Sequence, residues 1–199
     1  MKQLARSDSL APPERGQQRR GPLPGVDPFL PPDLTLPDIL QPGLDLVFVG
    51  INPSIYSAMR GHYFARPSNR FWVCLNQSGL VPEPVGPEDD ARLPSFGIGL
   101  TDIVKRATHD AAALSAAEFA DGREILREKL LHYAPRGVCF VGKLASTHYS
   151  RRRGLPFGEQ PERIGDSVVF VMPSTSGLVN QLHHERLRCL DEVRAFLGR

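Results

Sequence analysis

The sequence predicts an α/β fold, a three-layer α/β/α domain built around a short, mostly parallel sheet. Three apolar runs support this prediction, and they cover residues 46–49, 137–142 and 167–172. Each run is short and continuously apolar, which is typical of strands buried on both faces of a sheet. Segments with helical spacing lie between the runs, and parallel strands need such crossover connections. We find no internal repeat.

The predicted helices supply the two outer layers. Residues 68–79 follow a proline and end at a glycine, which are start and stop signals. Phe71, Trp72 and Leu75 would form the apolar face of this helix, so Trp72 is expected in the core. Further helices are expected over residues 121–134, 143–150 and 184–197.

Two more segments give local signals. Ser115 and Glu118 have the spacing of a capping box at a helix start. Residues 81–95 are rich in proline, with Pro82, Pro84 and Pro87 near their start, and are expected to form a surface connection with at most one helical turn. Their acidic run, residues 88–90, is expected to be solvated.

The chain divides into a tail and one domain. Residues 1–41 are expected to form a Pro-rich, largely disordered N-terminal tail, because such a segment buries too little apolar surface to offset the entropy lost on ordering. Within the tail, residues 29–40 have enough apolar side chains to lie against the domain. Residues 42–199 then form a single domain, a length that allows a full core.

Composition excludes several classes of protein. The net charge of +2 is too small to argue for nucleic acid by itself. The three cysteines, Cys74, Cys139 and Cys189, are far apart and offer no four-cysteine frame for iron–sulfur or zinc. We find no set of metal ligands and expect no cofactor. No apolar run approaches the roughly 20 residues that span a bilayer, and the start lacks the apolar core of a signal peptide, so we expect a cytoplasmic protein.

The first strand ends in a polar motif. Gly50 ends the apolar run, and Pro53 cannot continue a central strand because it has no N–H. Asn52 should therefore lie at the carboxyl end of the strand, where open α/β sheets bind their ligands. About a dozen loop residues follow, among them the aromatic residue Phe64.

Two further motifs should meet Asn52 at the same edge of the sheet. Residues 96–108, FGIGLTDIVKRAT, hold two glycines where the backbone approaches another segment closely, and then the acid Asp102. Residues 173–180, PSTSGLVN, follow the last strand. The residues alone leave Asp102 open to a second interpretation, as the N-cap of a helix that begins near Ile103.

The segments GINPS (residues 50–54) and RGHYFARPSNRFW (residues 60–72) resemble the mismatch-specific uracil-DNA glycosylases and their thymine-DNA glycosylase relatives. The resemblance extends from about Leu44 to Leu197. It implies a uracil-DNA glycosylase-like fold and a monofunctional DNA glycosylase of base excision repair. Such an enzyme flips uracil out of a G mismatch and hydrolyses its N-glycosidic bond.

The resemblance also implies roles for particular residues. Asn52 matches the catalytic asparagine of the family and Phe64 its stacking aromatic residue. The family members usually carry Lys or Asn at the position of Asp102. Besides Phe64, the residues expected in the base pocket are Ile51, Ser54 and Ser57. The residues expected to wedge into or contact DNA are Ser176, Gly177, Leu178, Asn180 and Lys143.

Elementary chemistry favours two catalytic groups. An amide such as Asn52 can orient water but is too weak a base to accept its proton. Asp102 could accept that proton and stabilise the developing sugar cation, so we expect Asn52 and Asp102 to act together. The resemblance also implies that Ser57 lies where small residues border the pyrimidine 5-position. Its hydroxyl could crowd a thymine methyl group there, so uracil is expected to be preferred.

The implied partner is double-stranded DNA with a G·U or similar mismatch, bound by a monomer that is nucleoid-associated if bacterial. Three alternatives remain: a glycosylase for another base such as hypoxanthine, a non-catalytic binder of mismatched or single-stranded DNA, and an unrelated nucleotide-binding enzyme. The last is disfavoured because no glycine-rich phosphate loop follows the first strand.

Overall fold

The computed structural model describes residue 31 and residues 34–199, without the side chains of residues 178–180. Within this part of the chain a five-stranded sheet has the order β2-β1-β3-β5-β4. Its parallel strands are β1 (Leu46–Gly50), β2 (Ile98–Asp102), β3 (Gly137–Val141) and β5 (Ser167–Met172). The fifth strand, β4 (Gly158–Ile164), pairs antiparallel with β5 at one edge. The predicted α/β class with a mostly parallel sheet is confirmed.

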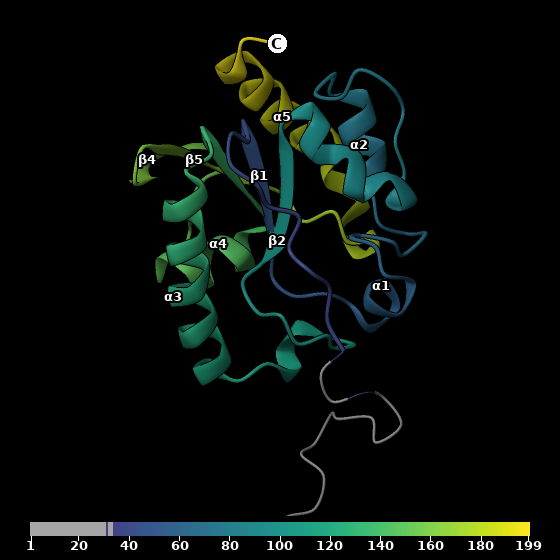
Figure 1. Ribbon diagram of the computed structural model, residues 1–199, viewed down its shortest axis with the longest axis vertical. Helices are drawn as coiled ribbons and strands as arrows, with labels where there is room; N and C mark the ends of the chain where they lie inside the picture. Colours follow the sequence, from purple (N-terminus) through teal and green to yellow (C-terminus); the bar gives the residue numbers. More distant parts are fainter. Residues whose placement is uncertain (1–30, 32–33) are drawn as a thin grey trace, which may run out of the picture.

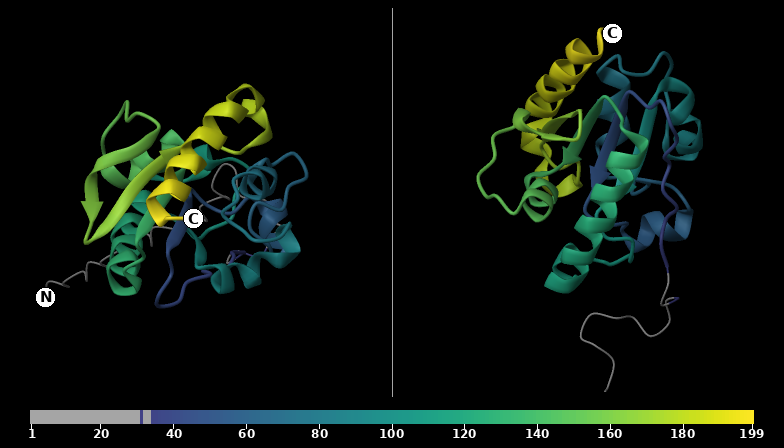
Figure 2. Two further views of the ribbon diagram at one scale, coloured as in Figure 1. Left: turned by 90° about the horizontal axis from the view of Figure 1, so that it is seen from above. Right: turned by 60° about the vertical axis from the view of Figure 1, so that its left-hand side comes forward.

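Helices cover both faces of the sheet (Figure 1). On one side lie α3 (Ala116–Tyr133) and α4 (Lys143–Ser150), and on the other lie α2 (Phe71–Gln77) and α5 (His183–Leu197), as a second direction of view also shows (Figure 2). Successive side chains of β1 alternate between the two layers, because a strand directs them to opposite faces. Leu46 and Phe48 join the core beneath α2 and α5. Val47 and Val49 join the core beneath α3.

Several local predictions are confirmed. Trp72 is 6% exposed and lies in the core, where its indole N–H donates to the carbonyl of Tyr63 at 3.0 Å. Ser115 and Glu118 form the capping box that begins α3. Gly99 marks a close approach of backbones, because a Cβ there would lie 2.8 Å from the carbonyl oxygen of Ile39.

Other local predictions are wrong. The expected loop after β1 contains a short helix, α1 (Ile55–Arg60), capped by the Ser54 hydroxyl. Helix α2 begins at Phe71 rather than at residue 68. The expected surface connection contains a ten-residue 3-10 helix, η1 (Pro87–Phe96). Two further 3-10 helices are η2 (Ala111–Ala113) and η3 (Gly177–Leu182).

One acid of the expected solvated run is buried. Asp90 is 4% exposed, and its carboxylate accepts from the Tyr63 N–H at 2.9 Å. The His62 ring nitrogen Nδ1 lies 3.1 Å from the other carboxylate oxygen. Asp90 therefore holds the loop that connects α1 to α2, instead of facing solvent.

Residues 34–40 lie against the domain, as expected. Ile39 and Leu100 exchange two backbone hydrogen bonds, of 2.9 and 3.0 Å, in an antiparallel bridge beside β2. Leu36 is 2% exposed and belongs to the core. The remaining residues of the predicted tail, 1–30 with 32 and 33, lie outside the described residues. No helix in the described part of the chain is long and apolar enough to cross a membrane.

Candidate active site

A cavity of about 540 Å³ opens at the carboxyl end of the sheet. Its walls come from the ends of β1 and β2, the start of α1, the loop between Tyr63 and Asn69, and residues 108–111 and 174–177. Asn52 and Asp102 both line it. Backbone bonds hold the two segments together, since Ile103 N–H donates to the Gly50 carbonyl at 3.1 Å and Val104 N–H to the Ile51 carbonyl at 2.9 Å. The volume is ordinary for a small-molecule or base pocket.

The orientation of the Asn52 amide is fixed by its partners. Its Nδ2 donates to the Arg106 carbonyl at 2.9 Å and to the Thr108 hydroxyl at 2.7 Å. A backbone carbonyl can only accept, so the nitrogen must face Arg106 and the oxygen must point the other way. Asn52 can therefore offer a hydrogen-bond acceptor to a water in the cavity.

Asp102 is the last residue of β2 and only 4% exposed. No helix begins at Ile103, so the N-cap interpretation is wrong. The carboxylate oxygen Oδ2 of Asp102 is buried without a hydrogen-bond partner among the described residues. Burial raises the pKa of Asp102 to about 7, while Lys105 acts to lower it and Asp38 to raise it further. A carboxyl group with such a pKa can exchange a proton near neutral pH.

Phe64 forms an apolar wall of the cavity. Its ring stacks on the buried Phe71, with centroids 4.1 Å apart and an interplanar angle of 23°. Phe64 has a φ of 52°, a left-handed conformation that is costly for a bulky residue and is found preferentially at functional sites. The packing of the loop thus keeps a partly exposed aromatic ring in the cavity wall.

The predicted serines form a small polar group. The Ser54 and Ser57 hydroxyls are 3.0 Å apart, and the Ala65 N–H donates to the Ser57 hydroxyl at 3.2 Å. Both serines line the cavity, and Ser57 is 4% exposed. Ser54 also accepts from the Ser57 N–H at 3.1 Å, so it caps α1 while it faces the cavity.

Comparison with known proteins identifies the family of this chain. The uracil DNA glycosylase superfamily matches residues 37–198 of the chain. The chain belongs to the uracil DNA glycosylase superfamily. The fold is similar to the solution NMR structure of a protein from Methanosarcina acetivorans that is described as a candidate uracil DNA glycosylase. The TM-score is 0.56 at 21% sequence identity, over 81% of this chain and 98% of the other. Membership of the superfamily indicates DNA glycosylase activity, the hydrolysis of an N-glycosidic bond.

The loop after β5 borders the cavity of this uracil DNA glycosylase superfamily protein. Ser176 and Gly177 line the cavity. A Cβ on Gly177 would lie 2.9 Å from the Ser68 carbonyl oxygen, so the two rims of the cavity are in close contact. The side chains of Leu178 and Asn180 lie outside the described residues. Lys143 does not line the cavity; it is exposed, with its ammonium 4.4 Å from the centroid of the Phe157 ring.

Arg186 supports this loop and is absent from the predicted site. Its side chain is 0% exposed, and Nε and Nη2 donate to the Ser174 carbonyl at 2.9 and 2.6 Å. Its place in the sequence gave a usable signal, because Arg186 shares helical spacing with the buried Cys189, Leu190 and Val193. An arginine on an apolar helix face needs a polar partner inside the protein.

Proposed function

We propose that the protein is a monofunctional DNA glycosylase of the mismatch-specific type, which removes uracil from G·U mismatches and leaves an abasic site. One observation carries the proposal: a fixed amide and a buried carboxyl group line the same cavity, together with a partly exposed aromatic ring. The carboxyl group is Asp102, the amide is Asn52 and the ring is Phe64. These are the groups that hydrolysis of a flipped nucleotide requires.

Base extrusion comes first. The glycosidic bond is inaccessible inside a duplex, so the nucleotide must leave the stack at a cost of a few kcal/mol, which is least at a mismatch. Stacking of the extruded base on Phe64 offsets roughly 1–3 kcal/mol of this cost. The leucine of the loop after β5, Leu178, would fill the gap in the duplex.

Hydrolysis then needs an oriented water. The Asn52 Oδ1 accepts a hydrogen bond from this water, and the Asp102 carboxylate accepts its proton as the oxygen bonds to the anomeric carbon. The bond to the base breaks, and its electron pair leaves with the pyrimidine, which takes a proton from solvent. Negative charge on Asp102 also stabilises the oxocarbenium-like transition state.

Ser57 would set the preference among pyrimidines. Its hydroxyl is held by the Ala65 N–H and by Ser54, so it cannot swing away to make room. A thymine carries a methyl group that uracil lacks. We therefore infer that uracil is excised faster than thymine. We also propose that the enzyme acts as a monomer.

The test is a panel of labelled duplexes carrying U·G, U·A, T·G or I·C, together with single-stranded uracil DNA, each treated with alkali after incubation. The proposal predicts strand breaks chiefly at uracil opposite guanine. Breaks only in the I·C duplex would make the protein a glycosylase for another base. Retained binding without any break would make it a non-catalytic mismatch binder.

A further inference from the structure

An ion-pair network lies behind the cavity. Asp38, in the segment before β1, receives hydrogen bonds through Oδ1 from the Lys105 ammonium at 2.7 Å and from the Thr101 hydroxyl at 2.7 Å. Its Oδ2 accepts from the Lys129 ammonium at 2.5 Å. Asp38 is fixed in place because its neighbour Ile39 is bonded to β2 through two backbone hydrogen bonds. The network thus joins three separate parts of the chain.

Lys105 connects this network to the cavity wall. Its ammonium donates to the Tyr63 hydroxyl at 3.0 Å and lies 5.6 Å from the centroid of the same ring. Tyr63 is 3% exposed and lines the cavity together with Asp102. Lys105 follows Asp102 by three residues and contacts Tyr63 on the same cavity wall, so its positive charge acts on the buried carboxyl group.

We propose that Asp38 is a positioning residue for the reaction: it holds Lys105 against Tyr63, and the Asp38–Lys105 pair sets the charge that faces Asp102. This inference rests on the proposed function, since it assigns the pair to the carboxyl group that accepts the proton. The segment before β1 would then contribute Asp38 to the active site, although the sequence of this segment resembles the end of a tail.

The two members of the pair act on Asp102 in opposite directions. Burial is the largest influence on the Asp102 pKa, and the Lys105 charge lowers this pKa while the Asp38 charge raises it. The other titratable or charged groups around the cavity are Tyr63, Arg66, His109 and Asp110. Lys129 contacts this network through its ion pair with Asp38. Removal of either charge of the pair should therefore move the Asp102 pKa, with opposite sign.

The variants Asp38→Asn and Lys105→Met separate the two charges. An asparagine retains an oxygen that can accept from Lys105 and Thr101, so Asp38→Asn removes the charge and keeps an acceptor. We expect the Asp102 pKa to fall by about one unit in Asp38→Asn and to rise by a similar amount in Lys105→Met. The pH at which uracil excision reaches half its maximum rate should move in the same directions.

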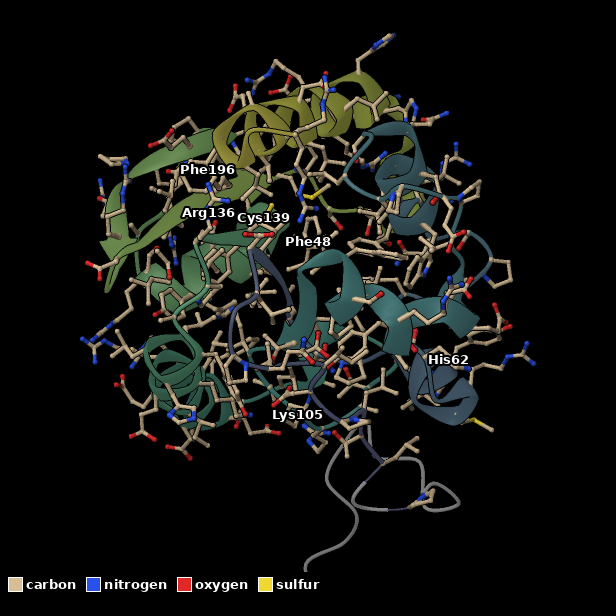
Figure 3. All side chains as sticks on the ribbon, turned by 45° about the horizontal axis from the view of Figure 1, so that its top comes forward. Phe48, His62, Lys105, Arg136, Cys139 and Phe196 are labelled. Carbon is tan, nitrogen blue, oxygen red and sulfur yellow. The ribbon has the colours of Figure 1, made fainter. Side chains whose placement is uncertain are left out.

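The matched control is Asp45→Asn. Asp45 also has two basic partners, Arg136 at 3.2 Å and Arg199 at 2.7 Å. It precedes β1 at the opposite end of the sheet, and Figure 3 shows its partner Arg136 far from Lys105. This variant removes a similar ion pair without changing the charge at the cavity, so the Asp102 pKa should not move.

Two measurements decide the inference. The first follows the carboxyl carbon of Asp102 by NMR in protein labelled with ¹³C-aspartate, assigned with Asp102→Asn. The second is the pH profile of single-turnover uracil excision. Opposite shifts in the two variants support the inference, and shifts of equal sign or none in folded variants overturn it.

The NMR titration needs no catalysis, so it separates this inference from the proposed function. If no duplex is cleaved but the opposite shifts occur, the proposed function fails while the pair still sets the charge at Asp102. If Asp38→Asn does not fold, Lys105→Met decides alone, by an upward shift of the Asp102 pKa or its absence.

Discussion

Gly50 and Asp102 lie opposite each other in the parallel pairing of β1 and β2, and the Asp102 carboxylate occupies the space that a side chain at position 50 would need. A Cβ on Gly50 would overlap the carboxylate oxygen Oδ1. The conformation of Gly50 is not the reason for a glycine here, since its φ is not in the left-handed region. A glycine is needed at position 50 because the Asp102 carboxylate lies against its Cα and leaves no room for a side chain.

The variant Gly50→Ala should therefore displace the Asp102 carboxylate. We expect a loss of uracil excision comparable with that of Asp102→Asn, while the fold is retained. The measurement is the single-turnover rate on a U·G duplex. Gly86→Ala is the control, because a Cβ there has its nearest neighbour at 3.6 Å, and this variant should keep the wild-type rate. An unchanged rate in Gly50→Ala would contradict the placement of the carboxylate.

The variant Thr108→Val should impair catalysis through Asn52. Valine has the shape of threonine but cannot accept the 2.7 Å hydrogen bond from Nδ2, so the amide loses its shortest hydrogen bond and keeps those to the Arg106 and Pro53 carbonyls. A lost buried hydrogen bond costs about 1–3 kcal/mol, and we expect roughly a tenfold slower excision step. Thr147→Val, on α4, provides the control. Equal rates for both variants would exclude Thr108 from orienting the amide.

Two arginines of α5 should differ in their effects. Arg186→Met removes both buried donors to the Ser174 carbonyl, and we expect it to cost about 1–3 kcal/mol of stability and to slow excision. Arg188→Met breaks exposed ion pairs with Glu185 and Glu192 and a long 3.5 Å hydrogen bond to the Phe157 carbonyl, and should cost less than about 1 kcal/mol. Denaturant unfolding and the excision rate measure both effects. Matching results for the two variants would show that Arg186 does not support the loop.

Asp102 should make the folded protein less stable as the pH rises. Burial raises its pKa from 3.8 to about 7, so between these values the folded state retains a proton that the unfolded state releases. The stability associated with this group is therefore greatest at low pH and is lost as the pH rises through about 7. Asp102→Asn has no carboxyl group to titrate, so it does not undergo this loss. The free energy of unfolding of the variant minus that of wild type should therefore increase by on the order of a few kcal/mol between pH 5 and pH 8.

Urea unfolding at the two pH values measures this change. Asp45→Asn controls for the general loss of an aspartate, and it should not reproduce the pH-dependent gain. A difference between Asp102→Asn and wild type that is the same at pH 5 and pH 8 would show that the Asp102 carboxyl group titrates normally.

The sequence predicts the centre of this fold better than its edges. The β1, β3 and β5 strands are buried on both faces, so their apolar runs stand out. The β4 strand is more than half exposed and contains Pro161, and its pairing with β5 is irregular between Glu159 and Arg163. An edge strand tolerates such a proline, but its sequence then resembles a loop. Helix α1 has only six residues, too few for a periodic pattern.

The candidate site was predictable where a motif carries it. Asn52 and Asp102 belong to motifs at strand ends and Phe64 to the loop motif that follows the first of them, and the structure brings all three to one cavity. The partners that position these residues come from distant segments and carry no local signal. Nothing in the acidic run distinguishes the buried Asp90 from the less buried Glu88 and Asp89. The residues around Asp38 likewise give no sign in the sequence of its contact with Lys105.

The most direct test of the account compares single-turnover excision of uracil from a U·G duplex by wild type, Asp102→Asn and Asn52→Ala, above pH 7. If Asp102 accepts the proton of the water that Asn52 orients, each variant should be slower by on the order of 100-fold, and the double variant should lose much less than the product of the two effects. An Asp102→Asn variant as fast as wild type would remove the carboxyl group from the mechanism and contradict the account.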